Sequence, residues 1–191
     1  MSSERGKLVV ISGPSGAGKT SVCRALKQHQ DVEFSVSATT RTMRQGERDG
    51  VDYHFLSRED FQRRLGENQF LEWATYNGNL YGTPRWPMDT ALAQGKTFLV
   101  EIEVKGTRQL RERGIPGLYL FIAPPDIAEL RRRLERRGSN DAEEISQRVR
   151  IAEDEIAAAQ EKVAGQPIYD LTIVNEDLQV TIRRVQELLW P

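Results

Sequence analysis

The sequence predicts an α/β fold in which a parallel sheet is flanked by helices. Four short apolar runs indicate buried strands, and helical patterns lie between them. The runs are Lys7–Ile11, Thr97–Ile102, Leu118–Ile122 and Leu171–Val174. Strands that alternate with helices are joined by right-handed crossovers and pair in parallel. The 191 residues predict a single domain with a core of its own.

The predicted elements follow one another in an order that fits this fold. The first strand leads into a glycine-rich turn and then into a helical pattern that extends to about Lys27. Further helical patterns cover Lys105–Arg113, which Gly114 closes, and Asp126–Arg137, which follows two prolines. We therefore expect the core to comprise residues of about 1–33, 90–130 and 155–191.

Two segments interrupt the alternation of strands and helices. Residues of about 34–89 are rich in turns and short strands, with a strand expected at Phe34–Ser37 and a capped helix beginning near Ser57. Residues of about 131–154 are dominated by charge, and a capping-box pattern of Asp141 and Glu144 predicts a helix start there. We expect both segments to be insertions on the core, where binding residues are often found.

Composition narrows the class of protein. The net charge of −1 gives no overall basic field, so nucleic acid is not an expected partner. The single cysteine, Cys23, excludes an intramolecular disulfide and fits a reducing compartment, and with only two histidines a structural metal is not expected. No apolar run approaches a membrane span or a signal peptide. These features predict a cytoplasmic protein without membrane attachment, a monomer or a small homo-oligomer.

Residues Gly13–Thr20, GPSGAGKT, match the pattern G-x-x-x-x-G-K-[ST] between a strand and a helix. The glycines let backbone N–H groups converge on phosphate oxygens, and the start of the helix adds the positive end of its dipole. We expect Lys19 to neutralise the β- and γ-phosphates and the Thr20 hydroxyl to ligate Mg²⁺. The predicted nucleoside triphosphate site comprises Gly13, Pro14, Ser15, Gly16, Ala17, Gly18, Lys19, Thr20 and Ser21.

This pattern makes the predicted sheet one of the P-loop NTPase type. It does not identify the phosphoryl acceptor, because ATPases, GTPases and small-molecule kinases share it. A GTPase switch would require an N-K-x-D tetrapeptide, and the chain contains none.

A second group of cationic residues lies in the first insertion. Arg41 and Arg44 follow the expected strand, and guanidinium groups suit bidentate binding of phosphate. Together with Ser37 and the Tyr53 hydroxyl they could surround one phosphate. The spacing alone does not decide between such a clamp and two solvated surface arginines.

The segment 39–56, TTRTMRQGERDGVDYHFL, resembles the signature of the guanylate kinase family. The segments GPSGAGKT, FSVSATTR, FLEWATYNGNLYGT, RRLERRG followed by EEISQR, and YDLTIVNED occur in the order and spacing of that family. The resemblance implies transfer of the γ-phosphoryl group of ATP to GMP, with dGMP as a related acceptor and Mg²⁺ as cofactor. It makes residues 34–89 a GMP-binding insertion and residues 131–154 a LID. The implied phosphate clamp for GMP comprises Ser37, Arg41, Arg44, Tyr53 and Tyr81.

The resemblance also implies how guanine is selected. Glu72 corresponds to a guanine-reading carboxylate, which accepts from N1–H and the exocyclic N2 amine, while Thr83 offers a hydroxyl to O6. Glu101 is grouped with the GMP-binding residues. Glu101 and Glu103, two apart on one side of a strand, are also where P-loop proteins keep an acid that orients Mg²⁺ through water. Relatives more often carry Asp-x-Asp and Gln-Gly at this point, and this chain has EIEVKG, with Lys105 at the glutamine position.

In the LID, the resemblance assigns Arg137 and Arg148 to the phosphates, so that the implied catalytic residues are Lys19, Arg44, Arg137 and Arg148. Asn175 corresponds to an adenine-side contact of the ATP site. Trp86 has no functional assignment, and packing is expected for it.

Two alternatives remain in view. The first is a non-catalytic interaction module of the same fold, against which the intact Lys19, Arg44 and Arg137 argue. The second is a P-loop kinase of another phosphorylated acceptor, such as a sugar. The guanine elements, Glu72 and Tyr81–Thr83, argue against that one.

Overall fold

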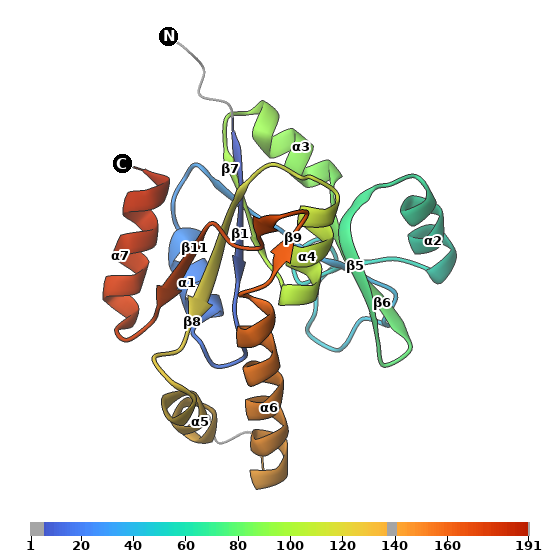
Figure 1. Cartoon of the computed structure of the whole chain (residues 1–191). Coiled ribbons are helices and arrows are strands. Elements are labelled where there is room, and N and C mark those ends of the chain that lie inside the picture. The colour runs from blue at the N-terminus through green and yellow to red at the C-terminus, as the bar shows by residue number, and fades with distance from the viewer. Residues whose placement is uncertain (1–5, 137–140, 191) are drawn as a thin grey trace.

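The computed structural model describes residues 6–136 and 141–190 and contains a five-stranded parallel sheet in the order β11-β8-β1-β7-β2 (Figure 1). The strands are β1 (Lys7–Ser12), β2 (Val32–Phe34), β7 (Thr97–Glu101), β8 (Leu118–Ala123) and β11 (Leu171–Val174). β1 lies at the centre, and all its residues after Lys7 are buried, as expected of a strand with neighbours on both edges and helices on both faces. The α/β fold with a parallel sheet is confirmed.

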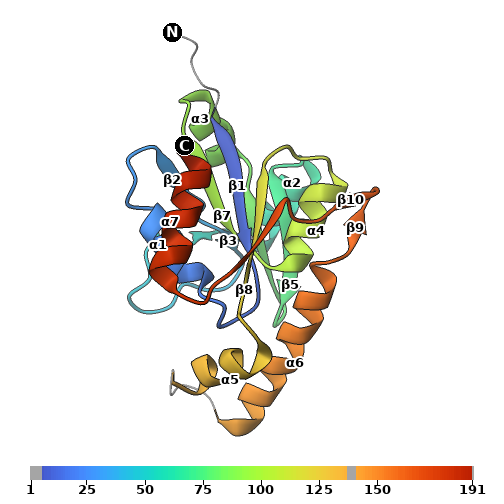
Figure 2. The same ribbon diagram turned by 60° about the vertical axis from the view of Figure 1, so that its left-hand side comes forward.

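Helices cover the two faces of the sheet (Figure 2). On one face α1 (Lys19–Leu26) and α7 (Leu178–Leu189) pack against Val9 and Ile11. On the other face α3 (Trp86–Ala93) and α4 (Val104–Glu112) pack against Leu8 and Val10. This division follows from the strand, because successive side chains point to opposite faces.

The first insertion is a separate lobe built on a four-stranded sheet of order β4-β3-β6-β5. Its elements are β3 (Ala38–Thr39), β4 (His54–Phe55), α2 (Arg58–Gly66), β5 (Phe70–Tyr76) and β6 (Asn79–Pro84). The lobe has a small core in which the rings of Phe61 and Phe70 stack 4.3 Å apart. Trp86 packs against this core, and the Arg64 guanidinium lies 4.7 Å from its ring, so the packing role expected for Trp86 is what the structure contains.

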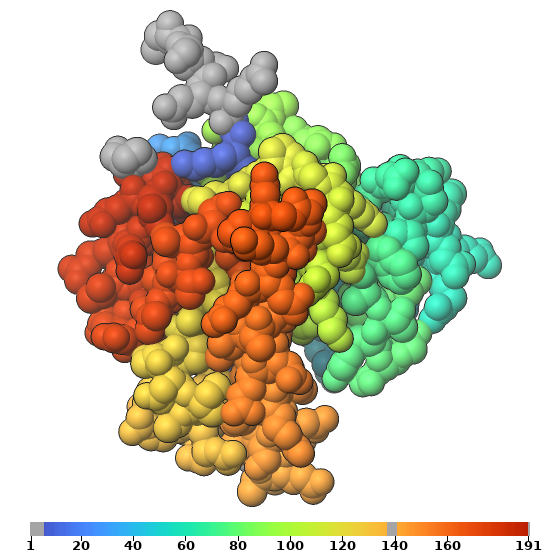
Figure 3. Space-filling model, viewed as in Figure 1, coloured from blue at the N-terminus to red at the C-terminus, as the bar shows by residue number. Residues whose placement is uncertain are grey.

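The second insertion is a pair of helices, α5 (Ile127–Arg136) and α6 (Ala142–Ala158), which pack on each other through Leu130, Leu134, Ile145 and Val149. They extend from the carboxyl-end side of the sheet (Figure 1), and the lobe of the first insertion projects from another side of the molecule (Figure 3). α6 continues past residue 154, where the second insertion was expected to end, and ends at Ala158. A short hairpin of β9 (Lys162–Val163) and β10 (Gln166–Pro167) follows.

The four strands and the helix starts predicted from local patterns are present. The Ser57 hydroxyl accepts from the Asp60 backbone N–H at 3.0 Å, and Asp141 caps α6 through the N–H groups of residues 143 and 144. The strand predicted at Phe34–Ser37 is wrong. β2 ends at Phe34, and after the backbone N–H of Ser35 bonds to the Leu99 carbonyl the chain crosses to the second sheet, where β3 begins at residue 38.

No helix within the described residues has the length and apolar character needed to cross a membrane.

Candidate active site

The glycine-rich loop connects the carboxyl end of β1 to the start of α1. Gly13, Gly16 and Gly18 adopt φ values of 145°, 91° and 100°, which other residues rarely adopt, and the Ala17 N–H bonds to the Pro14 carbonyl at 3.1 Å. The Lys19 ammonium folds back over the loop and donates to the carbonyls of Gly13 and Pro14, the latter at 3.0 Å. The loop is therefore a turn whose free N–H groups are available for an anion at the start of a helix.

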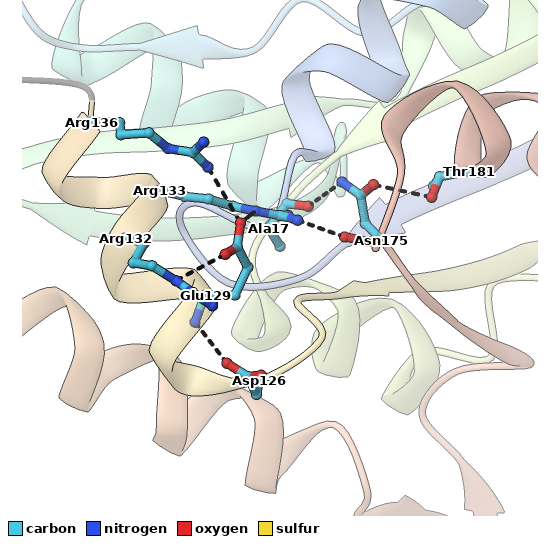
Figure 4. Close-up of polar contacts among 8 residues, drawn as sticks. All are labelled: Ala17, Asp126, Glu129, Arg132, Arg133, Arg136, Asn175 and Thr181. Atoms are coloured by element: carbon cyan, nitrogen blue, oxygen red, sulfur yellow. Dashed lines mark hydrogen bonds and ion pairs between the residues drawn. The ribbon is translucent and has the colours of Figure 1, made fainter.

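Asn175, directly after β11, contacts this loop at Ala17 (Figure 4). Its side-chain amide donates to the Ala17 carbonyl at 2.7 Å, and its side-chain carbonyl accepts from the Thr181 hydroxyl at 3.1 Å. Only 3% of Asn175 is exposed. A Cβ atom on Gly18 would collide with the amide nitrogen, which explains why a glycine stands there. The predicted contact of Asn175 with adenine stays a prediction, and the amide group is already engaged with the loop and α7.

α5 contacts Asn175 through Arg133. Its guanidinium donates to the backbone carbonyl of Asn175 at 2.8 Å and to the Glu129 carboxylate at 2.9 Å. Arg132 and Arg136 also pair with Glu129, and these two arginines are largely exposed. The ion pairs hold the pKa of Glu129 below its ordinary value.

A hydroxyl and a carboxylate from different elements are hydrogen-bonded beside the loop. The Thr20 hydroxyl donates to the Glu101 carboxylate at 2.7 Å, although β7 and α1 are remote in sequence. A hydroxyl and a carboxylate are the hard oxygen donors that Mg²⁺ prefers, so the residues present fit that ion. Glu103, two residues on, is the N-terminal cap residue of α4.

The electrostatics of Lys19 depend on three carboxylates. Burial lowers the pKa of Lys19, and the opposing influences are Glu155, Glu101 and Glu103, of which Glu155 is the largest. Burial in turn raises the pKa of Glu155, on α6, to about 7. No motif in the sequence points to Glu155. It lies seven residues after Arg148 and therefore on the same face of α6. Spacing alone does not reveal that this face is near Lys19, because that depends on how α6 packs.

In the lobe formed by the first insertion, the Arg41 guanidinium is held by Glu47. The Glu47 carboxylate accepts from the Arg41 guanidinium at 2.7 and 3.1 Å and from the Arg44 backbone N–H at 2.7 Å. The guanidinium also lies 5.4 Å from the Tyr53 ring, and Tyr81 lies edge-on to Tyr53 at 6.1 Å. Three of the five predicted clamp residues, Arg41, Tyr53 and Tyr81, are therefore neighbours.

The other two clamp residues flank this group. Arg44 extends from the same loop with an exposed side chain. Ser37 directly precedes β3, and its backbone carbonyl accepts from the His54 N–H at 2.8 Å, which fixes it next to the strand that follows Tyr53. Glu47 is the organising residue of this loop, because its carboxylate accepts from both the Arg41 side chain and the Arg44 backbone.

The two residues predicted to read guanine are in contact. Glu72 on β5 and Thr83 on β6 are paired across the strands, and the Thr83 hydroxyl donates to the Glu72 carboxylate at 2.6 Å. Burial raises the pKa of Glu72, and the nearby Glu103 adds to the rise. The charge of Glu103 thus raises the pKa of both Lys19 and Glu72, so the phosphate loop and the predicted base site adjoin near the start of α4.

Of the predicted LID arginines, Arg148 lies on α6 with its side chain partly buried. Arg137 lies outside the described residues.

A phosphate loop on the central strand of a parallel sheet, with a hydroxyl and a carboxylate beside it, defines a P-loop protein that binds a nucleoside triphosphate. Arg41 and Arg44, on one loop of the first insertion, are side chains suited to a second anionic ligand.

Comparisons with known proteins specify the family. The guanylate kinase family model matches residues 5–191. The chain is 47% identical to the guanylate kinase of Thermosynechococcus vestitus over 97% of this chain and 94% of that one, and 44% identical to that of Synechocystis over 98% and 95%. The crystal structure of guanylate kinase from Anaplasma phagocytophilum superposes with a TM-score of 0.69 at 32% identity, covering 97% of this chain and 85% of that one. The chain belongs to the guanylate kinase family.

Proposed function

We propose that this chain transfers the γ-phosphoryl group of ATP to GMP, giving ADP and GDP, with donor and acceptor sites on either side of Glu103. Membership of the guanylate kinase family supports the reaction. The observation that supports two adjoining sites is geometric: Glu101, at the end of β7, accepts from Thr20 of the phosphate loop, and Gly106, in the first turn of the helix that follows β7, lies against Glu72 of the first insertion.

At the donor site, the phosphate loop binds the triphosphate through backbone N–H groups, and Lys19 leaves the loop carbonyls to pair with the β- and γ-phosphates. Thr20 and Glu101 would hold Mg²⁺, Glu101 through water. When bound, this ion neutralises charge on the transferred group. The contact between Glu101 and Thr20 favours the metal role of Glu101 over a direct contact with GMP.

At the acceptor site, Arg41 and Arg44 bind the GMP phosphate together with Ser37, Tyr53 and Tyr81. Arg41 is pre-oriented by Glu47, so little of its side-chain freedom is lost on binding. A hydroxyl can donate one hydrogen bond, and in the structure the Thr83 hydroxyl donates it to the Glu72 carboxylate. When guanine N1–H and N2–H donate to the Glu72 carboxylate, the Thr83 hydroxyl can turn and donate to O6. Guanine thus replaces the hydrogen bond between Thr83 and Glu72 by three hydrogen bonds to the base.

In the transfer step, Lys19, Arg44 and the LID arginines Arg137 and Arg148 stabilise the charge on the moving phosphoryl group. Arginines used in this way contribute about 10³–10⁵ in rate. The LID also excludes water, which would otherwise compete with GMP as acceptor. We further propose that the protein acts in the cytoplasm, as a monomer or small homo-oligomer, on dGMP as well as GMP, in the recycling of GMP.

A coupled assay of ADP release tests the proposal, run with ATP and Mg²⁺ against GMP, dGMP, AMP, CMP and UMP. Turnover confined to the guanine nucleotides is expected. Arg44→Ala should abolish it, and Glu72→Ala should raise KM for GMP and weaken the choice of base. Turnover with AMP or a pyrimidine nucleotide at a rate similar to GMP would refute the assignment of the acceptor site.

A further inference from the structure

α4 lies beside β5, the strand that carries Glu72 (Figures 1 and 2). β5 is the last strand of its sheet, so one side of its backbone has no strand partner. Exposed N–H and C=O groups on such an edge must bond elsewhere. Here a helix of the core supplies the partners for the edge strand of the inserted lobe.

Two side chains bond to this edge on both sides of Glu72: Gln109 from within α4, and Arg113 from the C-terminal cap position of α4. The Gln109 carboxamide accepts from the Trp73 N–H at 3.2 Å and donates to the Trp73 carbonyl at 2.9 Å. Arg113 donates to the carbonyls of Phe70 and Leu71 at 2.9 and 3.1 Å. The backbone before and after Glu72 is therefore fixed to the core.

Gly106, in α4, is the third residue that adjoins this strand, and it lies against Glu72 itself. Residues 106, 109 and 113 are spaced by three and four, so they lie on one face of α4. A Cβ atom at position 106 would approach the Glu72 carboxylate oxygen Oε2 to 2.9 Å, with Cδ and Cγ at 3.3 Å. The carboxylate thus lies against the bare backbone of the first turn of α4. Glycine is among the least favourable residues in a helix interior, so helix stability does not explain its presence.

We propose that Gly106, Gln109 and Arg113 are positioning residues that set the location of the Glu72 carboxylate and so determine the selectivity for guanine. The inference rests on the proposed role of Glu72 in reading the base. Gln109 and Arg113 fix the strand, and Gly106 leaves the space that the carboxylate occupies while it accepts from Thr83. Because Glu72 is anchored to the core in this way, the base-reading group keeps a fixed relation to the phosphate loop.

The decisive variant is Gly106→Ala. The added methyl group displaces the end of a side chain, so the fold should tolerate it while the carboxylate moves. Misplacement of a positioning contact by about 1 Å costs up to about 100-fold, and we expect kcat/KM for GMP to fall about 10- to 100-fold. KM for ATP should stay within about twofold of wild type. Gly66→Ala is the matched control, since its added Cβ has no neighbour within 4 Å.

Inosine monophosphate provides a readout that a general loss of stability would not change. It lacks the 2-amino group, so a correctly placed Glu72 prefers GMP, and Gly106→Ala should lower that preference about tenfold. The double variant Glu72→Ala/Gly106→Ala should behave like Glu72→Ala, because without the carboxylate the methyl group displaces nothing.

Gln109→Met is the second variant, and it decides the matter if Gly106→Ala does not fold. It keeps the length of the side chain, removes both hydrogen bonds to Trp73, and should shift KM for GMP and the GMP preference in the same direction. Arg108→Ala, on the same helix but paired with Glu161, is its control. If Gly106→Ala and Gln109→Met both keep the wild-type preference for GMP over inosine monophosphate while Glu72→Ala is impaired, the positioning role is refuted and the proposed base reading by Glu72 stands. An unimpaired Glu72→Ala would overturn the proposed base reading as well.

Discussion

Replacing Asn175 with alanine tests whether the last strand supports the phosphate loop. The substitution removes the donor to the Ala17 carbonyl and the acceptor for the Thr181 hydroxyl, both of them buried. Leaving a buried polar group without a partner costs about 1–3 kcal/mol, so for two groups we expect a loss of about 2–6 kcal/mol in the free energy of unfolding. For a chain of this length that corresponds to a fall of about 4–24 °C in Tm.

The loss should also appear in the binding of ATP. A loop that is less ordered must be ordered again when its N–H groups bind phosphate, and each 1.4 kcal/mol of that cost weakens binding about tenfold. We therefore expect KM for ATP to rise about tenfold while KM for GMP stays nearly unchanged. The measurements are thermal unfolding by circular dichroism and steady-state kinetics with each substrate varied in turn.

Thr181→Val is the control for this prediction. It keeps the size of the side chain and removes only the hydrogen bond on the far side of Asn175, so it should cost about 1 kcal/mol and leave KM for ATP close to wild type. An Asn175→Ala protein with wild-type Tm, or with equal losses for ATP and GMP, would refute the reasoning that the amide acts locally on the loop.

Three further outcomes follow from the site. Glu47→Gln should weaken the pre-orientation of Arg41 and raise KM for GMP about 3- to 10-fold without changing KM for ATP, and equal changes in both would contradict the contact in the structure. Chelation with EDTA should stop turnover, and Glu101→Gln should raise the Mg²⁺ concentration for half-maximal rate about tenfold, whereas an unchanged requirement would exclude Glu101 from the metal site. The pKa of Glu155 is raised to about 7, so the folded state binds more protons than the unfolded state between about pH 4.5 and 7, and the contribution of this group to stability falls as pH rises through that range. Glu155→Gln should remove that dependence, so in urea unfolding its stability relative to wild type should be higher at pH 8 than at pH 5, and a constant difference would contradict the shifted pKa.

Local patterns predicted the fold well, and they also predicted the strand and the helix on either side of the glycine-rich loop. The phosphate loop occupies eight consecutive residues, and its conformation is set by glycines and by the strand and helix that adjoin it. The caps at Ser57 and Asp141 likewise depend on residues three or fewer positions away. The expected strand at Phe34–Ser37 failed because the chain changes sheets there, and sheet membership depends on distant strands rather than on local propensity.

The sequence by itself determined the type of chemistry, because motifs such as GPSGAGKT are contiguous and their resemblance to known signatures extends over the chain. Only the tertiary structure decided how the parts support one another. Asn175 bonds to a loop residue 158 positions earlier, Glu155 on α6 affects the pKa of Lys19, and Gly106 makes room for Glu72. The reason is physical: such contacts depend on which elements the fold brings together, and no spacing along the chain encodes the burial or the shape complementarity that results.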